Sequence, residues 1–572
     1  MKRVLPKPLV QDVSRALADW QSRSCTRRMW ERDTTLWSGA DEGKWLGWLT
    51  AVEDHQERID EFRLVAESVR SGGFAHAVLL GMGGSSMCPE VLRLSFGRID
   101  GAPDLCIIDS TDPGQIRDVE SRVDLARTIV IVASKSGSTL EPNILLEYFS
   151  ERVKAVVGER EAGSRFIAIT DPGSSLDRLA SERGFRHIVH GVPGIGGRFS
   201  ALSAFGLAPA AIMEIDVERL LRRATEMVRA CSPETPDASN PGVQLGVTLG
   251  VLAKGGRDKL TIVASPAIGD LGAWLEQLVG ESTGKGGKGI IPVDLEEPGA
   301  PDVYGNDRVF VYVRFTPVPD RAQDAAVKAL AQAGQPVLRI DIGSTYDLGQ
   351  EFFRWEIATA AAGAILGINP FDQPDVEASK IATRALTSAY ETSGAFPAET
   401  PLFSDGTLTF FTDERNAAEL NGAVGAARSA AAWLRAHLNR TKDGDYVALL
   451  AYIPMNEAHQ AALQATRHLV RNARRVATCL GFGPRFLHST GQIYKGGPNT
   501  GVFLQVTCDD AIDLPVPGRA FTFGVAKTAQ ARGDFQVLAE RGRRALRVHL
   551  GPDVAAGLRA LEAAVRAALE RP

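Results

Sequence analysis

Short apolar segments alternate with helical segments over most of this chain. Five apolar segments follow one another in its first half: AVLLG (77–81), LCIID (105–109), TIVIVAS (128–134), RFIAIT (165–170) and FRHIVHG (185–191). Helical segments such as LEPNILLEYFSERVKAVV (140–157) lie between them. Strands that alternate with helices pair in parallel, because each return to the sheet passes through a helix. The sequence therefore predicts an α/β fold with a parallel sheet and helices on both faces.

The same alternation starts again after a helical zone at 198–254. Its strand candidates are KLTIVAS (259–265), RVFVYVRF (308–315), PVLRIDI (336–342), YVALLAYI (446–453) and GVFLQVT (501–507). We expect these five strands to form a second sheet, and hence two α/β domains. The predicted divisions are a helical N-terminal segment (1–70), the first domain (71–240), the first part of the second domain (241–346), a helical section (347–440), and the rest of the second domain with C-terminal helices (441–572).

Composition excludes several classes of protein. Hydrophobic residues make up 44% of the 572 residues and charged residues 23%, as in a soluble globular protein. A net charge of −5 gives no electrostatic case for nucleic acid or membrane partners. No apolar segment is long enough to span a bilayer or to serve as a signal peptide, so we expect a cytoplasmic protein. The scattered cysteines indicate neither a zinc site nor a disulfide framework: Cys25, Cys88, Cys106, Cys231, Cys479 and Cys508.

Glycine is in excess, with 57 residues, and one glycine-rich loop directly follows a predicted strand. The loop GMGGSSMCPEV (81–91) adds the hydroxyls of Ser85 and Ser86 to backbone N–H groups near a helix start. Such a loop suits a phosphate. A dinucleotide fingerprint would need glycine where Ser86 stands, and a tight structural turn is the third interpretation.

A second loop after a strand is rich in hydroxyl groups. SKSGSTLEP (134–142) places Ser134, Ser136, Ser138 and Thr139 within six residues at the start of a helix. These groups can bind phosphate oxygens without a metal, although a serine-rich turn with a helix cap would look similar. Two such loops on neighbouring strands favour a phosphorylated ligand.

Two further loops carry one charged residue each that suits catalysis. In GVPGIGGRFSALSAFGL (191–207), Arg198 follows paired glycines and could hold a phosphate or a developing oxyanion, or form a surface ion pair. In WLEQLVGESTGKGGKGIIPV (274–293), Glu281 ends a helix with Gln277 one turn earlier on the same face. Glu281 is a candidate general base, with an ordinary solvent-facing glutamate as the alternative.

Together these motifs resemble the phosphoglucose isomerase family. GMGGSS, SKSGST, GGRFSALSAFGL, EQLVGESTGK and NPFDQPDVEASK (369–380) match its motifs over about 45–550. The resemblance implies two sugar-isomerase (SIS) domains, each a three-layer αβα unit, with helical N-terminal, inserted and C-terminal segments. It is closest to the isomerase half of fused transaldolase–phosphoglucose isomerase proteins. A transaldolase barrel would need about 250 further residues, so we expect this chain to lack that activity.

The resemblance also assigns roles to residues. It implies that Glu281 is the base, that Arg198 lies beside the reacting carbons, and that Lys380 assists. The implied substrate-binding residues are Gly84, Ser85, Ser134, Ser136, Ser138, Thr139, Gly197 and Gln277. Pro142 and Cys88 depart from the hydroxyl and the glycine usual in the family, so one phosphate hydrogen bond is expected to be missing.

The histidine that opens the sugar ring is out of its usual order. The family places it shortly after the glutamate, but no histidine occurs between His190 and His437. The segment LHSTGQIYKGG (487–497) instead follows the NPFDQ motif. The resemblance therefore assigns the role to His488, with the order of segments rearranged.

The implied reaction interconverts glucose 6-phosphate and fructose 6-phosphate. His488 and Lys380 would open the ring, Glu281 would move a proton between C2 and C1, and Arg198 would stabilise the enediolate. Neither a metal nor an organic cofactor is implied, and the family predicts a homodimer. Alternatives are a non-catalytic sugar-phosphate-binding regulator, or an isomerase for mannose 6-phosphate or an amino sugar phosphate, with Thr283 as a residue that could affect specificity.

Overall fold

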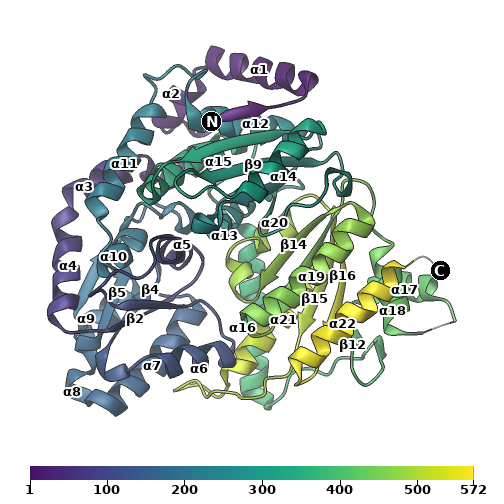
Figure 1. Ribbon diagram of the computed structural model, residues 1–572. Helices are drawn as coiled ribbons and strands as arrows, with labels where there is room; N and C mark the ends of the chain where they lie inside the picture. The colour runs from purple at the N-terminus through teal and green to yellow at the C-terminus, as the bar shows by residue number, and fades with distance from the viewer. Residues whose placement is uncertain (427, 571–572) are drawn as a thin grey trace.

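The computed structural model describes residues 1–426 and 428–570 and contains three sheets, each built mainly of parallel strands. In Figure 1 the first sheet lies at the lower left, the second above it, and the third on the right. The chain is therefore mixed α/β with parallel sheets, as the alternation of strands and helices predicts.

The first sheet contains the five strands predicted between residues 77 and 191, in the order β3-β2-β4-β5-β6 and all parallel. Strands β2 and β4 are buried almost throughout because helices cover both faces, which explains their continuous apolar sequence. The strands are β2 (His76–Gly81), β3 (Asp104–Ile108), β4 (Thr128–Ala133), β5 (Phe166–Thr170) and β6 (His187–His190). The helices are α5 (Met87–Phe96), α6 (Pro113–Arg122), α7 (Leu140–Val157), α8 (Glu159–Ala162) and α9 (Ser175–Glu182).

The second sheet has the order β1-β10-β9-β7-β8. Its strands are β7 (Lys259–Ala264), β8 (Ile291–Val293), β9 (Arg308–Phe315), β10 (Val337–Ile342) and the short antiparallel edge strand β1 (Lys2–Val4). Helices α13 (Leu271–Leu275), α14 (Arg321–Gln332) and α15 (Leu348–Leu366) belong to this region. The remaining helices of this half are α1 (Lys7–Ser22), α2 (Cys25–Trp30), α3 (Ala51–Glu57), α4 (Ile59–Ser71), α10 (Ala204–Ile212), α11 (Val217–Ala230) and α12 (Pro241–Lys254).

The prediction of a single second sheet is wrong. Segments 446–453 and 501–507 form β13 (Tyr446–Tyr452) and β15 (Gly501–Thr507) of a separate third sheet, in the order β11-β12-β16-β15-β13-β14. The residues 441–572 are therefore not the rest of the second sheet. Buried parallel strands are apolar on both faces, so their sequence does not specify which strand they pair with. The other strands are β11 (Phe403–Ser404), β12 (Thr409–Phe411), β14 (Ala477–Phe482) and β16 (Arg544–His549).

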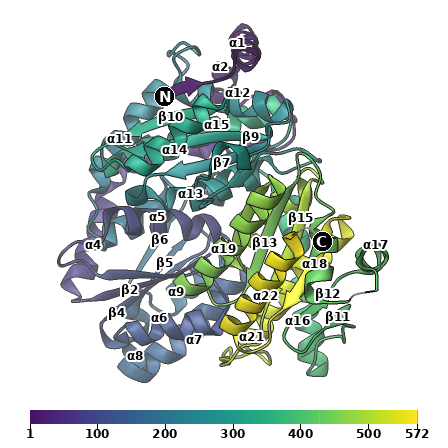
Figure 2. The ribbon, with the colours of Figure 1, turned by 45° about the vertical axis from the view of Figure 1, so that its right-hand side comes forward.

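The helices of the third sheet cover both of its faces. Alternate residues of β13 pack against different helices: Val447 and Leu449 share a core with α22, whereas Ala448 and Leu450 share one with α21. Figure 2 shows α19 and α22 side by side over one face. The helices of this part are α16 (Pro374–Ser393), α17 (Glu414–Val424), α18 (Ala430–Leu438), α19 (Glu457–Arg474), α20 (Gly491–Gly496), α21 (Phe523–Glu540) and α22 (Val554–Leu569).

The section 347–440 is less helical than expected. It contains α15, α16, α17 and α18, but residues 403–411 form an antiparallel hairpin, β11 and β12, at the edge of the third sheet. The Asp405–Gly406 turn between two short apolar segments is a sequence signal for such a hairpin.

All three sheets share one strand order. Each has its parallel strands arranged so that the first strand in sequence lies between the second and the third: β3-β2-β4, β8-β7-β9 and β14-β13-β15. In such a sheet, ligands bind outside the carboxyl ends of the strands, beside the point where the order reverses. The loops after β2 and β4 lie at this point of the first sheet.

The third sheet is tied to the first by buried groups. Val516 and Phe521 belong to the same apolar core as the strand residues Val78 and Val130. On α21, Lys527 forms ion pairs with Asp112, at 2.9 Å, and with Asp510. Burial alone would lower the pKa of Lys527, but Asp112 outweighs it and the pKa is raised. Asp112 also caps α6 of the first sheet, accepting from the backbone N–H of Gln115.

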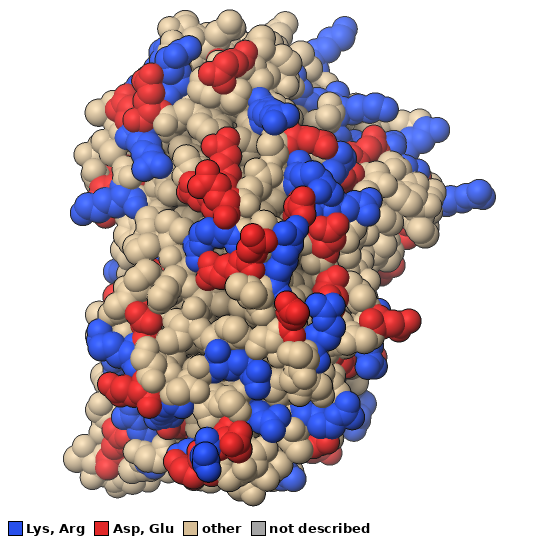
Figure 3. Space-filling model, turned by 90° about the vertical axis from the view of Figure 1, so that its left-hand side faces the viewer, with Lys and Arg blue, Asp and Glu red and all other residues tan. Residues whose placement is uncertain are grey.

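The charged surface is mixed. Figure 3 shows acidic and basic side chains interspersed over the face drawn, without a continuous field of either sign. None of the described helices has the length and apolar character required to cross a membrane.

Replacing Lys527 with methionine should destabilise the protein by about 3–5 kcal/mol, because Asp112 and Asp510 would remain buried without their cation. The measurement is the free energy of unfolding in urea. Lys154→Met is the matched control, since it removes an exposed ion pair with Glu159 and should cost about 0–1 kcal/mol. Equal losses in the two variants would contradict the role given to Lys527.

Candidate active site

The predicted base lies at the end of an unusual helical turn. Residues Glu276–Glu281 form a π-helical segment that directly continues α13, and such turns occur frequently at functional sites. Glu281 is buried, with 7% of its surface exposed. One carboxylate oxygen accepts from Gln277 Nε2 at 3.2 Å, and the other lies 3.4 Å from Arg198 Nη1. The carboxylate therefore has a defined position and a cation beside it.

Arg198 is held on all sides by the neighbouring loops. Its Nε donates to Ser282 Oγ at 2.7 Å, and its Nη groups donate to Gln373 Oε1 and to the carbonyl oxygen of Pro370. Burial lowers the pKa of Arg198, and the carboxylate of Glu281 acts against that shift. Residues 370–373 of the NPFDQ motif thus surround the guanidinium and fix its direction.

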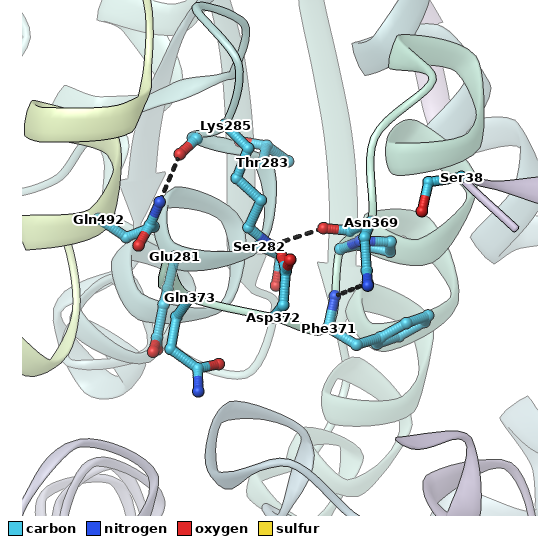
Figure 4. A network of polar contacts seen from close by, with 12 residues as sticks. Ser38, Glu281, Ser282, Thr283, Lys285, Asn369, Phe371, Asp372, Gln373 and Gln492 are labelled. Carbon is cyan, nitrogen blue, oxygen red and sulfur yellow. Dashed lines mark hydrogen bonds and ion pairs between the residues drawn. The ribbon is translucent and has the colours of Figure 1, made fainter. Parts of the chain in front are cut away.

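Lys285 contacts Asn369 and Asp372 of the NPFDQ motif, the segment that also contacts Arg198 (Figure 4). Its Nζ donates to the carbonyl oxygen of Asn369 at 2.6 Å and lies 2.9 Å from Asp372 Oδ1. Burial lowers the pKa of Lys285 to about 7, with the nearby Arg198 as the second cause. Thr283 is fully buried, and its hydroxyl donates to the carbonyl oxygen of Val279. Thr283 therefore supports the loop and does not face a ligand.

The third sheet brings His488 to this group within the same chain. The carbonyl oxygen of His488 accepts from Gln277 Nε2 at 2.8 Å, so one amide contacts both Glu281 and the histidine segment. His488 Nε2 lies 2.9 Å from Glu141 Oε1. That oxygen also accepts from Gln530 Nε2 at 2.6 Å. Burial alone would raise the pKa of Glu141, but the charge of His488 and its hydrogen bond outweigh it, so the pKa is lowered.

The glycine loop after β2 packs against the loop that carries Arg198. A Cβ atom at Gly84 would overlap the carbonyl oxygen of Gly197, so only glycine permits this approach. Gly83 has a φ of +56° and faces Gln277 and His488. Ser85 is buried, like both of these glycines. The loop therefore brings the segments of Arg198, Gln277 and His488 close together.

The hydroxyl loop after β4 leads into the 18-residue helix α7. Ser136 and Ser138 are exposed, and their Oγ atoms lie 2.7 Å apart. Gly137 has a φ of +66°, and a Cβ there would overlap the backbone nitrogen of Leu176. The hydroxyl of Thr139 does not cap its own helix. Exposed hydroxyls at the positive end of a helix form a suitable environment for an anion.

A cavity of about 420 Å³ joins the hydroxyl loop to His488. Of the predicted residues, it is lined by Ser136, Ser138, Thr139, Lys380 and His488. Lys380 Nζ lies 3.7 Å from the carboxylate of Glu377. Arg198, Glu281, Gln277 and Gly84 form a buried group that adjoins His488, and they do not line this cavity. Ser134 is buried under the loop and is not brought to the cavity.

The residues that sequence reasoning missed are those whose partners are distant in sequence. Glu141 stands within the SKSGSTLEP segment, and an acidic residue in the first turn of a helix that follows a hydroxyl loop is its only signal. Gln530 and Gln373 carry no motif that identifies them as site residues before their contacts are known. His488 was predicted from the family resemblance. Its position after strand β14, at the carboxyl end of a parallel strand, is a further indication of a site residue.

Comparison with known proteins places the chain in a family. Residues 47–302 match the model of the phosphoglucose isomerase family. The glucose-6-phosphate isomerase of Rubrobacter xylanophilus is 31% identical over 376 residues, which cover 58% of this chain and 86% of that protein. The chain belongs to the phosphoglucose isomerase family. The enzyme of the same name from Parabacteroides distasonis is 32% identical over 291 residues, covering 44% of this chain and 64% of its own.

Solved structures agree with this family assignment at the level of the fold. A hypothetical protein from Thermus thermophilus superposes with a TM-score of 0.58 at 25% identity, over 67% of this chain and 99% of its own. A glucose-6-phosphate isomerase from Chlamydia trachomatis gives a TM-score of 0.50 at 21% identity, over 59% of this chain and 74% of its own. Both matches leave a third or more of this phosphoglucose isomerase family member uncovered.

Gly84→Ala should lower kcat/KM of this family member by about 10²-fold, because a displacement of about 1 Å at a reacting group has this effect. The added methyl group must displace the backbone of Gly197 and with it Arg198, which contacts Glu281. The measurement is steady-state turnover of fructose 6-phosphate, with thermal unfolding as a check on folding. Gly196→Ala is the control in the neighbouring loop, since a Cβ there meets nothing within 4 Å. A similar loss in both variants would contradict the close-approach argument.

Proposed function

We propose that this chain is an aldose–ketose isomerase that interconverts glucose 6-phosphate and fructose 6-phosphate. The observation that carries the proposal is the contact between buried Glu281 and Arg198, joined through Gln277 to the His488–Glu141 pair. A base, a cation for a developing oxyanion and an acid–base histidine are the groups that an enediolate mechanism requires. The similarity to named glucose-6-phosphate isomerases supports the same conclusion.

Ring opening is assigned to His488 and Lys380. Both line the cavity, and Glu141 holds one ring nitrogen of His488. The free nitrogen can then exchange a proton with the ring oxygen or O1 of the sugar, while Glu141 stabilises the imidazolium that forms. Lys380 supplies a second N–H donor for the same oxygens.

Proton transfer between C2 and C1 is assigned to Glu281. Its carboxylate removes the proton at one carbon and returns it to the other through a cis-enediolate. Arg198 stabilises the negative charge that develops on the oxygens, and because its direction is fixed by Ser282, Gln373 and Pro370, it does not have to reorganise during the step.

Replacing Glu281 with glutamine should lower kcat by about 10²–10⁴-fold, the usual contribution of a general base. Glutamine keeps the shape but has one acceptor oxygen where Gln277 and Arg198 both present donors, so one of these contacts is lost. The hydroxyl loop is unchanged, so binding of glucitol 6-phosphate should weaken far less than kcat. The measurements are a coupled assay of fructose 6-phosphate conversion and calorimetric titration with glucitol 6-phosphate, an open-chain analogue that serves as the inhibitor. Near-normal turnover in this variant would overturn the proposed base.

Replacing Glu141 with glutamine should lower kcat at least about 10-fold, because the amide cannot stabilise a charged His488. The affinity for glucitol 6-phosphate, which has no ring to open, should stay within about twofold. This combination separates loss of ring opening from loss of the binding site. Unchanged turnover, or an equal loss of inhibitor affinity, would contradict the positioning role of Glu141.

The two other candidate functions give different results in the same assay. A non-catalytic sugar-phosphate-binding regulator would bind glucitol 6-phosphate without turnover, yet it would not need Glu281, Arg198 and Lys380 together. An isomerase of altered specificity would prefer mannose 6-phosphate or an amino sugar phosphate over fructose 6-phosphate. Thr283, which could affect specificity, is buried, and its hydroxyl donates to the carbonyl oxygen of Val279.

Three finer proposals accompany this function. We propose that the chain is related to the isomerase half of fused transaldolase–phosphoglucose isomerase proteins, as its motifs suggest. Cytoplasmic location and a homodimer also stay predictions. His488 and Glu281 lie in one chain here, so a dimer would not be needed to bring them together.

A further inference from the structure

We propose that Arg519, contributed by the third sheet, binds the phosphate group of the substrate. This rests on the proposed function, since it adds a residue to the phosphate site of that reaction. Arg519 lies in the segment 508–522 between β15 and α21. It lines the same cavity as Ser136, Ser138 and Thr139. It also lines a second cavity together with Gly137 of the hydroxyl loop.

The segment that carries Arg519 is fixed to the first sheet. Val516 and Phe521, on either side of Arg519, are buried in the core of that sheet. Asp513 fastens the base of the segment by accepting from Gly524 N at 2.8 Å and from Thr522 Oγ1. The backbone N–H of Arg519 donates to the carbonyl oxygen of Val516, which closes a turn. Arg519 therefore stands at the tip of an anchored turn beside the hydroxyl loop.

The guanidinium of Arg519 is available for a ligand. Within the described part of the chain it forms no ion pair, unlike the other cations that line the cavity. Arg384 and Lys380 both pair with Glu377, and His488 pairs with Glu141. An exposed arginine held by its backbone presents its planar set of donors to a phosphate without competition from a carboxylate.

The hydroxyl loop itself lacks a cation for a phosphate dianion. Its lysine, Lys135, is turned away, with Nζ 2.8 Å from Asp171 Oδ2 and bonded to the carbonyl oxygen of Val192. The end of α7 supplies only about half a positive charge, whereas a phosphate monoester carries about −1.5 to −2 at pH 7. Arg519, a cation from outside the loop, would supply the positive charge that the loop lacks.

The test compares two inhibitors that differ only in the phosphate group, glucitol 6-phosphate and glucitol. Arg519→Ala should raise the Ki of glucitol 6-phosphate and the KM of fructose 6-phosphate by about 10–100-fold. It should leave the Ki of glucitol within about twofold. Arg519→Lys should recover part of the loss, because it keeps the charge but not the planar donors. Arg559→Ala, an exposed arginine of α22, is the control for the loss of one surface charge.

The role of Arg519 is overturned if the two inhibitors weaken by the same factor, or if glucitol 6-phosphate weakens less than twofold. It is equally overturned if Arg559→Ala gives the same loss as Arg519→Ala. Calorimetric titration reads the inhibitor affinities without turnover. Wild-type protein that binds glucitol 6-phosphate but converts no fructose 6-phosphate would therefore refute the proposed reaction while leaving the ratio of affinities to decide on Arg519.

Discussion

The side-chain amide of Gln277 joins two parts of the molecule that lie 211 residues apart in sequence. Its nitrogen donates both to the carboxylate of Glu281 and to the backbone of His488. The candidate base belongs to the second sheet, the histidine to the third, and the histidine's partner Glu141 to the first. The site therefore exists only where three sheets meet. The function of the site therefore depends on contacts that hold the three sheets in fixed positions relative to one another.

Buried charge performs much of this positioning. Apolar contacts between helices can slide, but a buried ion pair has one acceptable geometry and is costly to break. Lys527 with Asp112 connects α21 to the first sheet, and α21 also carries Gln530, which holds Glu141. On α20, Lys495 Nζ lies 2.5 Å from Asp534 of α21, and both side chains are buried. The helix that follows the histidine segment and the helix that braces Glu141 are thus fixed to each other.

The loops of the site could be predicted from the sequence because each directly follows a buried strand, and the carboxyl ends of parallel strands are where ligands bind. Arg198, Ser136 and Ser138 were predicted in this way, whereas Glu281 was predicted from its position at the end of a helix before a glycine-rich loop. The role of Glu141 could not be predicted, because it depends on His488 and Gln530, which are 347 and 389 residues away. The third sheet was missed for a related reason: β13 and β15 are apolar on both faces, so nothing in their sequence excludes pairing with β7 or β9. Ser134 belongs to the same motif, but its side chain is buried and does not line the cavity, which the sequence pattern does not indicate.

The third sheet explains why a rearranged order of segments remains compatible with the chemistry. Catalysis requires that a group is held at a defined position, and chains with different orders of segments can place it there. The third sheet supplies His488 through the loop after β14, Gln530 through α21 and Arg519 through the segment after β15. His488 lies at the ring-opening end of the site, Gln530 holds Glu141, and Arg519 lies beside the hydroxyl loop.

A displacement of the third sheet would therefore weaken phosphate binding and ring opening together. Binding of the phosphate at Arg519 and Ser136 would, by the same connection, hold the sheet where His488 meets Glu141. The remote phosphate group would thus contribute to catalysis by securing the position of an acid–base residue, which is the way in which binding energy away from the reacting carbons can raise the rate.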